Sequence, residues 1–188
     1  VLKQKETNKT SPMVAIMSVF GSRFQLLDDA VQALIDANVT TVVVAGNGGF
    51  DACDYSPAAA ADAITVGAIL RNDSIAEWSN KKDCVDIYAP GEDIYSAWKK
   101  NDTDMREASG TSFAAPFVAG AAALLLEQHP QWKPKQVWTA ISRDSLVSYD
   151  GELLLYIPVP PWAYWADWYS LFEVKRMFWY WMRLWFRN

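Results

Sequence analysis

A serine that can act as a nucleophile stands inside the stretch Ser109–Gly120. Behind it comes an alanine-rich, wholly apolar run that predicts a buried helix over Ser112–Gln128. Gly110 allows the backbone to turn tightly just before the serine. Free N–H groups and the helix dipole favour negative charge in a first helical turn. The pattern predicts that Ser112 attacks a carbonyl carbon by nucleophilic catalysis. Taken alone, the same string also fits a Ser/Thr cap on a buried alanine-rich helix.

A second polar side chain, that of Asn47, stands in a glycine-rich loop directly after a β-branched run. Hydrolysis of a peptide bond through a serine needs a nucleophile, a base that takes its proton, and donors for the oxyanion. The side-chain amide of Asn47 and the backbone N–H of Ser112 would supply two such donors. The alternative for Asn47 is a left-handed turn residue without a catalytic role.

Four short apolar runs predict the strands that carry these loops: Val14–Ser18, Val42–Ala45, Ala63–Val66 and Val85–Tyr88. Apolar residues at helical spacing predict a helix over Asp28–Ala37, and a proline-first segment predicts another over Pro134–Ile141. This strand–helix–strand order favours an α/β fold with a parallel sheet and helices packed on it. Because ligands of such sheets bind beyond the carboxyl ends of the strands, Ser18, Asn47 and Ser112 should meet there.

The serine stretch resembles the nucleophile motif of the subtilase family of serine proteases, Gly-Thr-Ser-x-Ala-x-Pro-x-Val-Ala-Gly, at every fixed position. Other strings resemble further family segments in the family order, some of them typical of the proteinase K-like branch: Met17–Gly21, Val43–Asn47, Asp51–Ala68 and Trp78–Gly91. The resemblance implies that residues 1–157 are the C-terminal portion of a subtilase catalytic domain. The expected fold is an incomplete, three-layer, subtilisin-like α/β fold, and residues 158–188 would form a separate, helical aromatic tail.

The resemblance also implies roles for individual residues. Ser112 would be the catalytic nucleophile and Asn47 the oxyanion residue. The substrate-binding residues would be Ser18, Val19, Phe20, Gly21, Ala45, Gly46, Gly110 and Thr111. Substrate backbone would lie against the Ser18–Gly21 segment as an added β-strand. Phe20 departs from the family, which has glycine there, and a phenyl group would narrow or block the primary specificity pocket.

The base of the catalytic triad is missing from this sequence. In subtilases the catalytic Asp and His precede the substrate-binding strand, whereas the single histidine here is His129, at the far end of the predicted serine helix. A helix rises about 1.5 Å per residue, so His129 would lie roughly 25 Å from Ser112. Because Val1 is not methionine, we expect the chain to begin partway through a longer one. The alternative is a decayed copy of the enzyme.

Two further features follow from the resemblance. Cys53 and Cys84 stand in strings that hold a disulfide in some members of the branch, and the alternative is two buried free thiols. A disulfide would favour a secreted or lumenal protein, whereas free thiols fit a cytosolic or vacuolar relative. Asp86 resembles the carboxylate of a structural calcium site whose other protein ligands would be the backbone carbonyls of Ala61 and Ala63. The alternative for Asp86 is a structural residue in a turn.

Composition limits the remaining functions. The net charge is −5 and there is no basic run, which argues against nucleic-acid binding. Six of the ten tryptophans lie between Trp162 and Trp185, so the tail could lie in a membrane interface, cover a partner, or be spurious translated sequence. Three functions are open: an endopeptidase acting on peptide or protein substrates together with the missing N-terminal half of the domain, an inactive binding module, or a membrane-surface protein acting through its tail.

Overall fold

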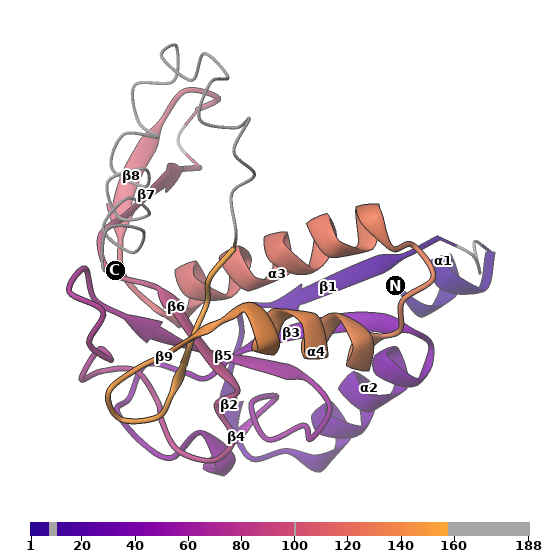
Figure 1. Ribbon diagram of the computed structural model, residues 1–188, viewed down its shortest axis with the longest axis horizontal. Helices are drawn as coiled ribbons and strands as arrows, with labels where there is room; N and C mark the ends of the chain where they lie inside the picture. Colours follow the sequence, from indigo (N-terminus) through magenta and orange to yellow (C-terminus); the bar gives the residue numbers. More distant parts are fainter. Residues whose placement is uncertain (8–10, 100, 158–188) are drawn as a thin grey trace. The chain divides into compact units, whose positions relative to one another are not determined.

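The computed structural model describes residues 1–7, 11–99 and 101–157 (Figure 1). The chain divides into two compact units, which are treated separately. The larger unit comprises Val1–Ile94 with Glu107–Ile157, and the smaller one includes Tyr95–Arg106. The aromatic tail expected over residues 158–188 lies outside the described residues. All the candidate site residues lie in the larger unit.

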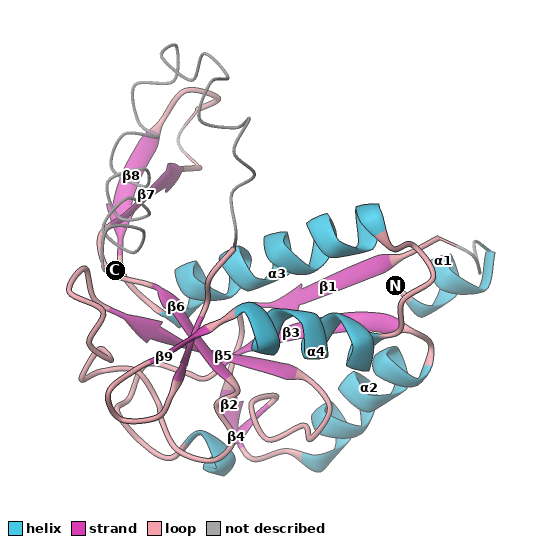
Figure 2. Cartoon of the chain, in the orientation of Figure 1, coloured by secondary structure: helices cyan, strands magenta, loops and turns pink. Residues whose placement is uncertain are grey.

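The larger unit is built on a six-stranded sheet (Figure 2). Its strands, in spatial order, are β1 (Met13–Met17), β3 (Val39–Val44), β5 (Ile64–Ile69), β6 (Ile87–Pro90), β10 (Leu153–Leu154) and β9 (Leu146–Val147). The first five strands pair in parallel, and β9 runs antiparallel to β10. The four predicted strands are therefore confirmed as parallel neighbours, with ends that differ from the prediction by up to three residues.

Two smaller sheets complete the strands. The strands β2 (Gly21–Ser22) and β4 (Tyr55–Ser56) pair antiparallel, and β7 (Ile94–Ala97) pairs with β8 (Met105–Ala108). The β2–β4 pair ties the segment after β1 to the segment that follows a short 3₁₀ helix, Ala52–Asp54.

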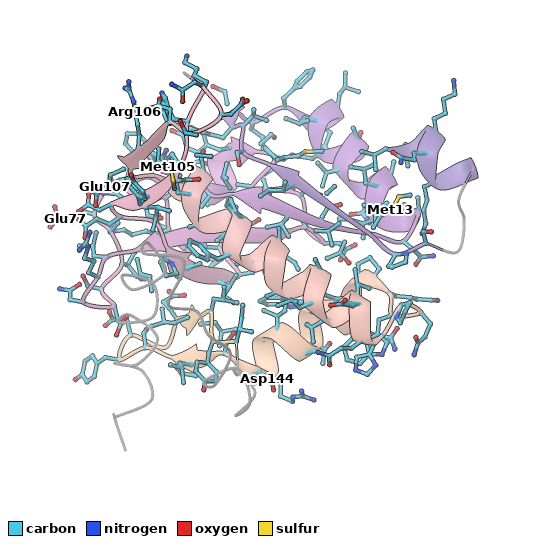
Figure 3. All side chains as sticks on the ribbon, turned by 90° about the horizontal axis from the view of Figure 1, so that it is seen from above. Met13, Glu77, Met105, Arg106, Glu107 and Asp144 are labelled. Atoms are coloured by element: carbon cyan, nitrogen blue, oxygen red, sulfur yellow. A yellow bond between two sulfur atoms is a disulfide. The ribbon has the colours of Figure 1, made fainter. Side chains whose placement is uncertain are left out.

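Four α-helices are described: α1 (Leu2–Thr7), α2 (Gln25–Asp36), α3 (Thr111–Gln128) and α4 (Pro134–Asp144). The helix predicted from Asp28 begins three residues earlier, and α3 begins one residue before Ser112. α2 ends at Asp36, one residue before the predicted end, and Asn38 beyond it takes a left-handed φ of 60° while its N–H donates to the Ile35 carbonyl. Figure 3 shows Met13 at the start of β1 and Asp144 at the end of α4.

The sheet is covered on both faces, which confirms the three-layer architecture. Side chains alternate along β3: Val42 and Val44 pack with α3 and α4, whereas Val39 and Val43 pack with α2. α3 presents small, fully buried residues to the sheet, including Ala114, Ala115, Val118 and Ala122. Small side chains let this helix lie close to the strands, and the close packing fixes the position of its N-terminus, where Ser112 stands.

Candidate active site

The start of α3 is shaped by a glycine. Gly110 precedes the helix with φ 155° and ψ 160°, a region essentially restricted to glycine, and its N–H donates to the Gly91 carbonyl at 2.8 Å. Thr111 is the first helical residue and Ser112 the second, so the Ser112 N–H is one of the groups without an intrahelical acceptor. Ser112 is half-buried. The predicted nucleophile therefore stands in a first helical turn, where its own N–H has no intrahelical acceptor.

Asn47 lies against this first turn. Its Oδ1 accepts hydrogen bonds from the Thr111 N–H at 2.9 Å and from the Thr111 hydroxyl at 2.8 Å. A backbone N–H can only donate, so the atom that faces it must be the carbonyl oxygen of the amide. The Nδ2 end lies 3.3 Å from the point where a Cβ on Gly110 would stand. The structure therefore places the donor end of Asn47 beside the residues that lead into Ser112.

Thr111 joins the two loops. It is fully buried, and while its hydroxyl donates to Asn47 it also accepts from the Gly46 N–H at 3.3 Å. One threonine thus fixes both the direction of the Asn47 amide and the backbone just before it. A hydroxyl is needed for this, because only a group that donates and accepts at once can bridge these two partners.

Asn80 is a positioning residue for which no role was predicted. It is fully buried, its Nδ2 donates to the Ala45 carbonyl at 2.9 Å, and its Oδ1 accepts from the N–H groups of Gly48 and Phe50 at 3.0 Å each. Its own N–H donates to the Gly46 carbonyl at 2.9 Å. Asn80 therefore holds the loop on both sides of Asn47. Asn80 does belong to the Trp78–Gly91 segment that resembles the family, but the resemblance assigns no role to this asparagine.

The predicted substrate-binding residues divide by exposure. Ser18, Val19 and Phe20 are exposed in the extended segment that leads from β1 into β2, which starts at Gly21. In contrast, Ala45, Gly46, Gly110 and Thr111 are buried or largely covered, and they form the base of the region around Asn47. All eight residues lie in the larger unit. The exposed segment follows β1, whereas Ala45 and Gly46 follow β3, and Gly110 and Thr111 follow β8.

His129 does not approach Ser112. It follows the last residue of α3, and its ring stacks on Trp132 with centroids 3.9 Å apart. The 18 residues of α3 separate the two ends by roughly 27 Å. Since His129 is the only histidine of the chain, no imidazole of this polypeptide can take the Ser112 proton.

The predicted disulfide is confirmed. Cys53 and Cys84 are bonded, with Cα atoms 5.2 Å apart and a sequence separation of 31, and the alternative of two free thiols is wrong. The bond links the 3₁₀ helix after the Asn47 loop to the turn that precedes β6. Asp51 supports the same helix, because its carboxylate accepts from the Cys53 N–H at 2.9 Å.

Asp86 lies just before β6, opposite Thr65. Its Oδ2 accepts from the Thr65 N–H at 2.7 Å, and its own N–H donates to the Thr65 carbonyl at 3.0 Å. Burial raises the pKa of this carboxyl to about 6, against the opposing effect of the Thr65 hydrogen bond. No group of three or more His, Cys, Asp or Glu side chains that could hold a metal occurs within the described part of the chain. A cation here would need backbone oxygens as further ligands.

Comparison with known proteins places these features in a family. The model of the subtilase family, Peptidase_S8, matches residues 8–153. The chain is 45% identical over 158 residues to an extracellular serine proteinase of Thermus sp. (strain Rt41A), covering 80% of this chain and 38% of that protein. It is 44% identical over 130 residues to an alkaline serine exoprotease A of Vibrio alginolyticus, covering 69% of this chain and 24% of that protein.

A solved structure agrees with the fold. The crystal structure of a cold adapted subtilisin-like serine proteinase superposes with a TM-score of 0.78 at 36% identity, over 85% of this chain and 60% of that one. The chain therefore spans well under half the length of the curated relatives described above and about three fifths of the solved structure.

Proposed function

Because this chain belongs to the subtilase family, we propose that Ser112 and Asn47 form the nucleophile and oxyanion part of a serine endopeptidase site that cleaves peptide bonds. The observation that carries the proposal is the pair of hydrogen bonds from Thr111 to Asn47 Oδ1 at 2.9 and 2.8 Å. They turn the Nδ2 donor towards the backbone that leads into Ser112.

In this proposal Ser112 Oγ attacks the carbonyl carbon of the scissile bond. The negative charge that develops on the carbonyl oxygen is stabilised by the Asn47 Nδ2 and the Ser112 N–H, both fixed before the reaction starts. The proton of Ser112 has to pass to a base from outside this chain, since His129 stands at the opposite end of α3. We assign that base to a further segment of the catalytic domain, which is thus a partner of this chain.

A second candidate function is an inactive binding module on the same fold. Two observations favour it: the single histidine is remote from Ser112, and Phe20 lies where the family has glycine. A membrane-surface function of residues 158–188 is a separate proposal, because these residues lie outside the described ones. Among the described residues, no helix has both the length and the apolar character needed to cross a membrane.

A secreted or lumenal location is supported by the Cys53–Cys84 disulfide and by the relative named extracellular, while a vacuolar location is the alternative. We also propose structural calcium at Asp86. The fit rests on the half-buried carboxylate of Asp86, since burial disfavours its negative charge and a bound cation would offset that cost. Asp86 pairs with the start of β5, directly after the turn that holds Ala61 and Ala63. Their backbone carbonyls would be the other protein ligands, since calcium prefers oxygen.

The catalytic proposal is tested by supplying the missing base from solution. The full chain is incubated with a peptidyl p-nitrophenyl ester in imidazole buffer, and the acylated residue is identified by mass spectrometry. Because p-nitrophenolate is a far better leaving group than the serine alkoxide, acylation should outpace deacylation, and acyl-enzyme should accumulate on Ser112. Ser112→Ala should abolish the label, and Asn47→Leu should slow acylation by about 10²–10³, the cost of losing one oxyanion donor in subtilisin, the same family.

The control is Asn72→Leu, which removes an exposed asparagine whose side chain accepts two hydrogen bonds from Ser74 in its own turn. It should acylate at the wild-type rate. Label spread over several surface residues, or an Asn47 variant as fast as wild type, would contradict the proposed site.

A further inference from the structure

Three aromatic rings lie next to one another beside the Asn47 loop. Phe20 meets Tyr55 edge-on with centroids 6.0 Å apart, and Phe50 stacks on Tyr55 at 6.3 Å. Phe20 is 44% exposed and Phe50 is 59% exposed. Phe20, Tyr55 and Phe50 are called the aromatic row below. Large apolar side chains gathered at a surface mark a place where a ligand is contacted.

The end of the aromatic row at Phe20 covers the backbone beside Asn47. A Cβ built on Gly46 would lie 3.1 Å from Phe20 Cδ2 and 3.2 Å from Phe20 Cε2, so the ring already touches the glycine. Gly46 has φ 105°, a conformation that favours glycine, and is followed directly by Asn47. The space that the glycine leaves open is thus shared by the phenyl ring and Asn80 Nδ2, which is the atom nearest to the same Cβ position.

Two contacts fix the ring in this place. The next residue, Gly21, pairs with Ser56 in the β2–β4 sheet, which brings Phe20 alongside Tyr55. An edge-to-face arrangement is a favoured geometry for two aromatic rings. Moving Phe20 away from Gly46 would therefore give up both the contact with the backbone and the contact with Tyr55.

The position of the ring bears on the substrate. A carbonyl attacked by Ser112 must place its oxygen at hydrogen-bond distance from Asn47 Nδ2. The Cβ of the residue that contains this carbonyl lies only two bonds from the carbonyl carbon, and Gly46 directly precedes Asn47, so a large side chain extending towards Gly46 would meet the Phe20 ring. We infer that Phe20 restricts the residue on the acyl side of the scissile bond to a small side chain, such as that of Gly, Ala or Ser. The inference rests on the proposed function.

The test is a binding measurement, which does not need the missing base. Two peptidyl boronic acids, identical except for a final alanine or phenylalanine analogue, are titrated into the full chain by calorimetry. Wild type should bind the alanine compound at least about tenfold more tightly, the scale of discrimination that methylene-sized changes produce in an apolar pocket. Phe20→Gly should remove this preference by strengthening binding of the phenylalanine compound about tenfold or more.

Phe20→Ala is the second variant, because it lacks the ring but keeps an ordinary backbone, and it should shift the preference in the same direction. Phe24→Gly is the matched control: Phe24 is 56% exposed and precedes α2, and its loss should leave the ratio unchanged. Circular dichroism establishes that each variant is folded.

The outcomes separate this inference from the proposed function. If Asn47→Leu weakens binding of both compounds but neither Phe20 variant alters their ratio, the inference is wrong and the proposed site stands. A wild-type preference for the phenylalanine compound also overturns the inference. If Asn47→Leu leaves both affinities unchanged, the compounds bind elsewhere, and the proposed function fails together with the inference.

Discussion

Replacing Asn80 with leucine should destabilise the protein severely, although Asn80 touches no substrate. The change keeps the size of a fully buried side chain but removes its three hydrogen bonds, to Ala45, Gly48 and Phe50. Each such bond contributes about 0.5–1.5 kcal/mol, and a buried group left without its partner costs about 1–3 kcal/mol. Because the Ala45 carbonyl is buried whereas the other two residues are exposed, we expect a loss of roughly 3–5 kcal/mol in the free energy of unfolding.

Urea unfolding followed by tryptophan fluorescence measures this loss, and Asn72→Leu is again the matched control. Asn72 also accepts two hydrogen bonds, both from Ser74 within an exposed turn, so its loss should cost about 0.5 kcal/mol or less. In the imidazole assay, under conditions where Asn80→Leu remains folded, acylation of Ser112 should also slow. Equal losses for the two variants would refute the conclusion that Asn80 holds the Asn47 loop.

Three other changes have expected outcomes. Without calcium, the free energy of unfolding should fall as pH rises from about 4 to 6, because folded Asp86 binds its proton more tightly (pKa about 6) than unfolded Asp86 (3.8). The total fall in the free energy of unfolding is at most about 3 kcal/mol, and Asp86→Asn should remove this pH dependence. Calcium should raise the melting temperature of wild type but not that of Asp86→Asn. Replacing Cys53 and Cys84 with serine should lower stability by about 3–4 kcal/mol, as chemical denaturation without reductant would measure, and a loss under 1 kcal/mol would contradict this. Gly67→Ala should cost about 1–3 kcal/mol in the same assay, since its Cβ would lie 2.3 Å from Cε1 of the buried Tyr88, and an unchanged midpoint would show that the ring moves freely.

Much of the fold could be predicted because its signals are local. The β-branched runs predict parallel strands, since a strand buried on both faces has no polar alternation, and β3 is buried at all six positions. The paired strands β9 and β10 could not be predicted in this way. They have two residues each, and two residues show no periodicity.

The candidate site was predictable only in part. Ser112 and Asn47 could be proposed because their strings match family motifs in the family order, whereas taken alone each residue also fits a structural role. The role of Asn80 was hidden, since all its partners are backbone atoms, which every sequence possesses. The contact of Phe20 with Gly46 was hidden for a related reason: it depends on the β2–β4 pairing, which joins segments more than thirty residues apart.

The most direct test of the central claim is a crystal structure of the chain with a peptidyl boronic acid that ends in the alanine analogue. A boron atom bonded to a serine becomes tetrahedral and mimics the intermediate of acyl transfer. We predict a bond between boron and Ser112 Oγ, with one boronate oxygen about 2.7–3.1 Å from both Asn47 Nδ2 and the Ser112 N–H. A boron atom that remains trigonal, or whose oxygens lie away from Asn47, would contradict the assignment of Ser112 and Asn47 to one active site.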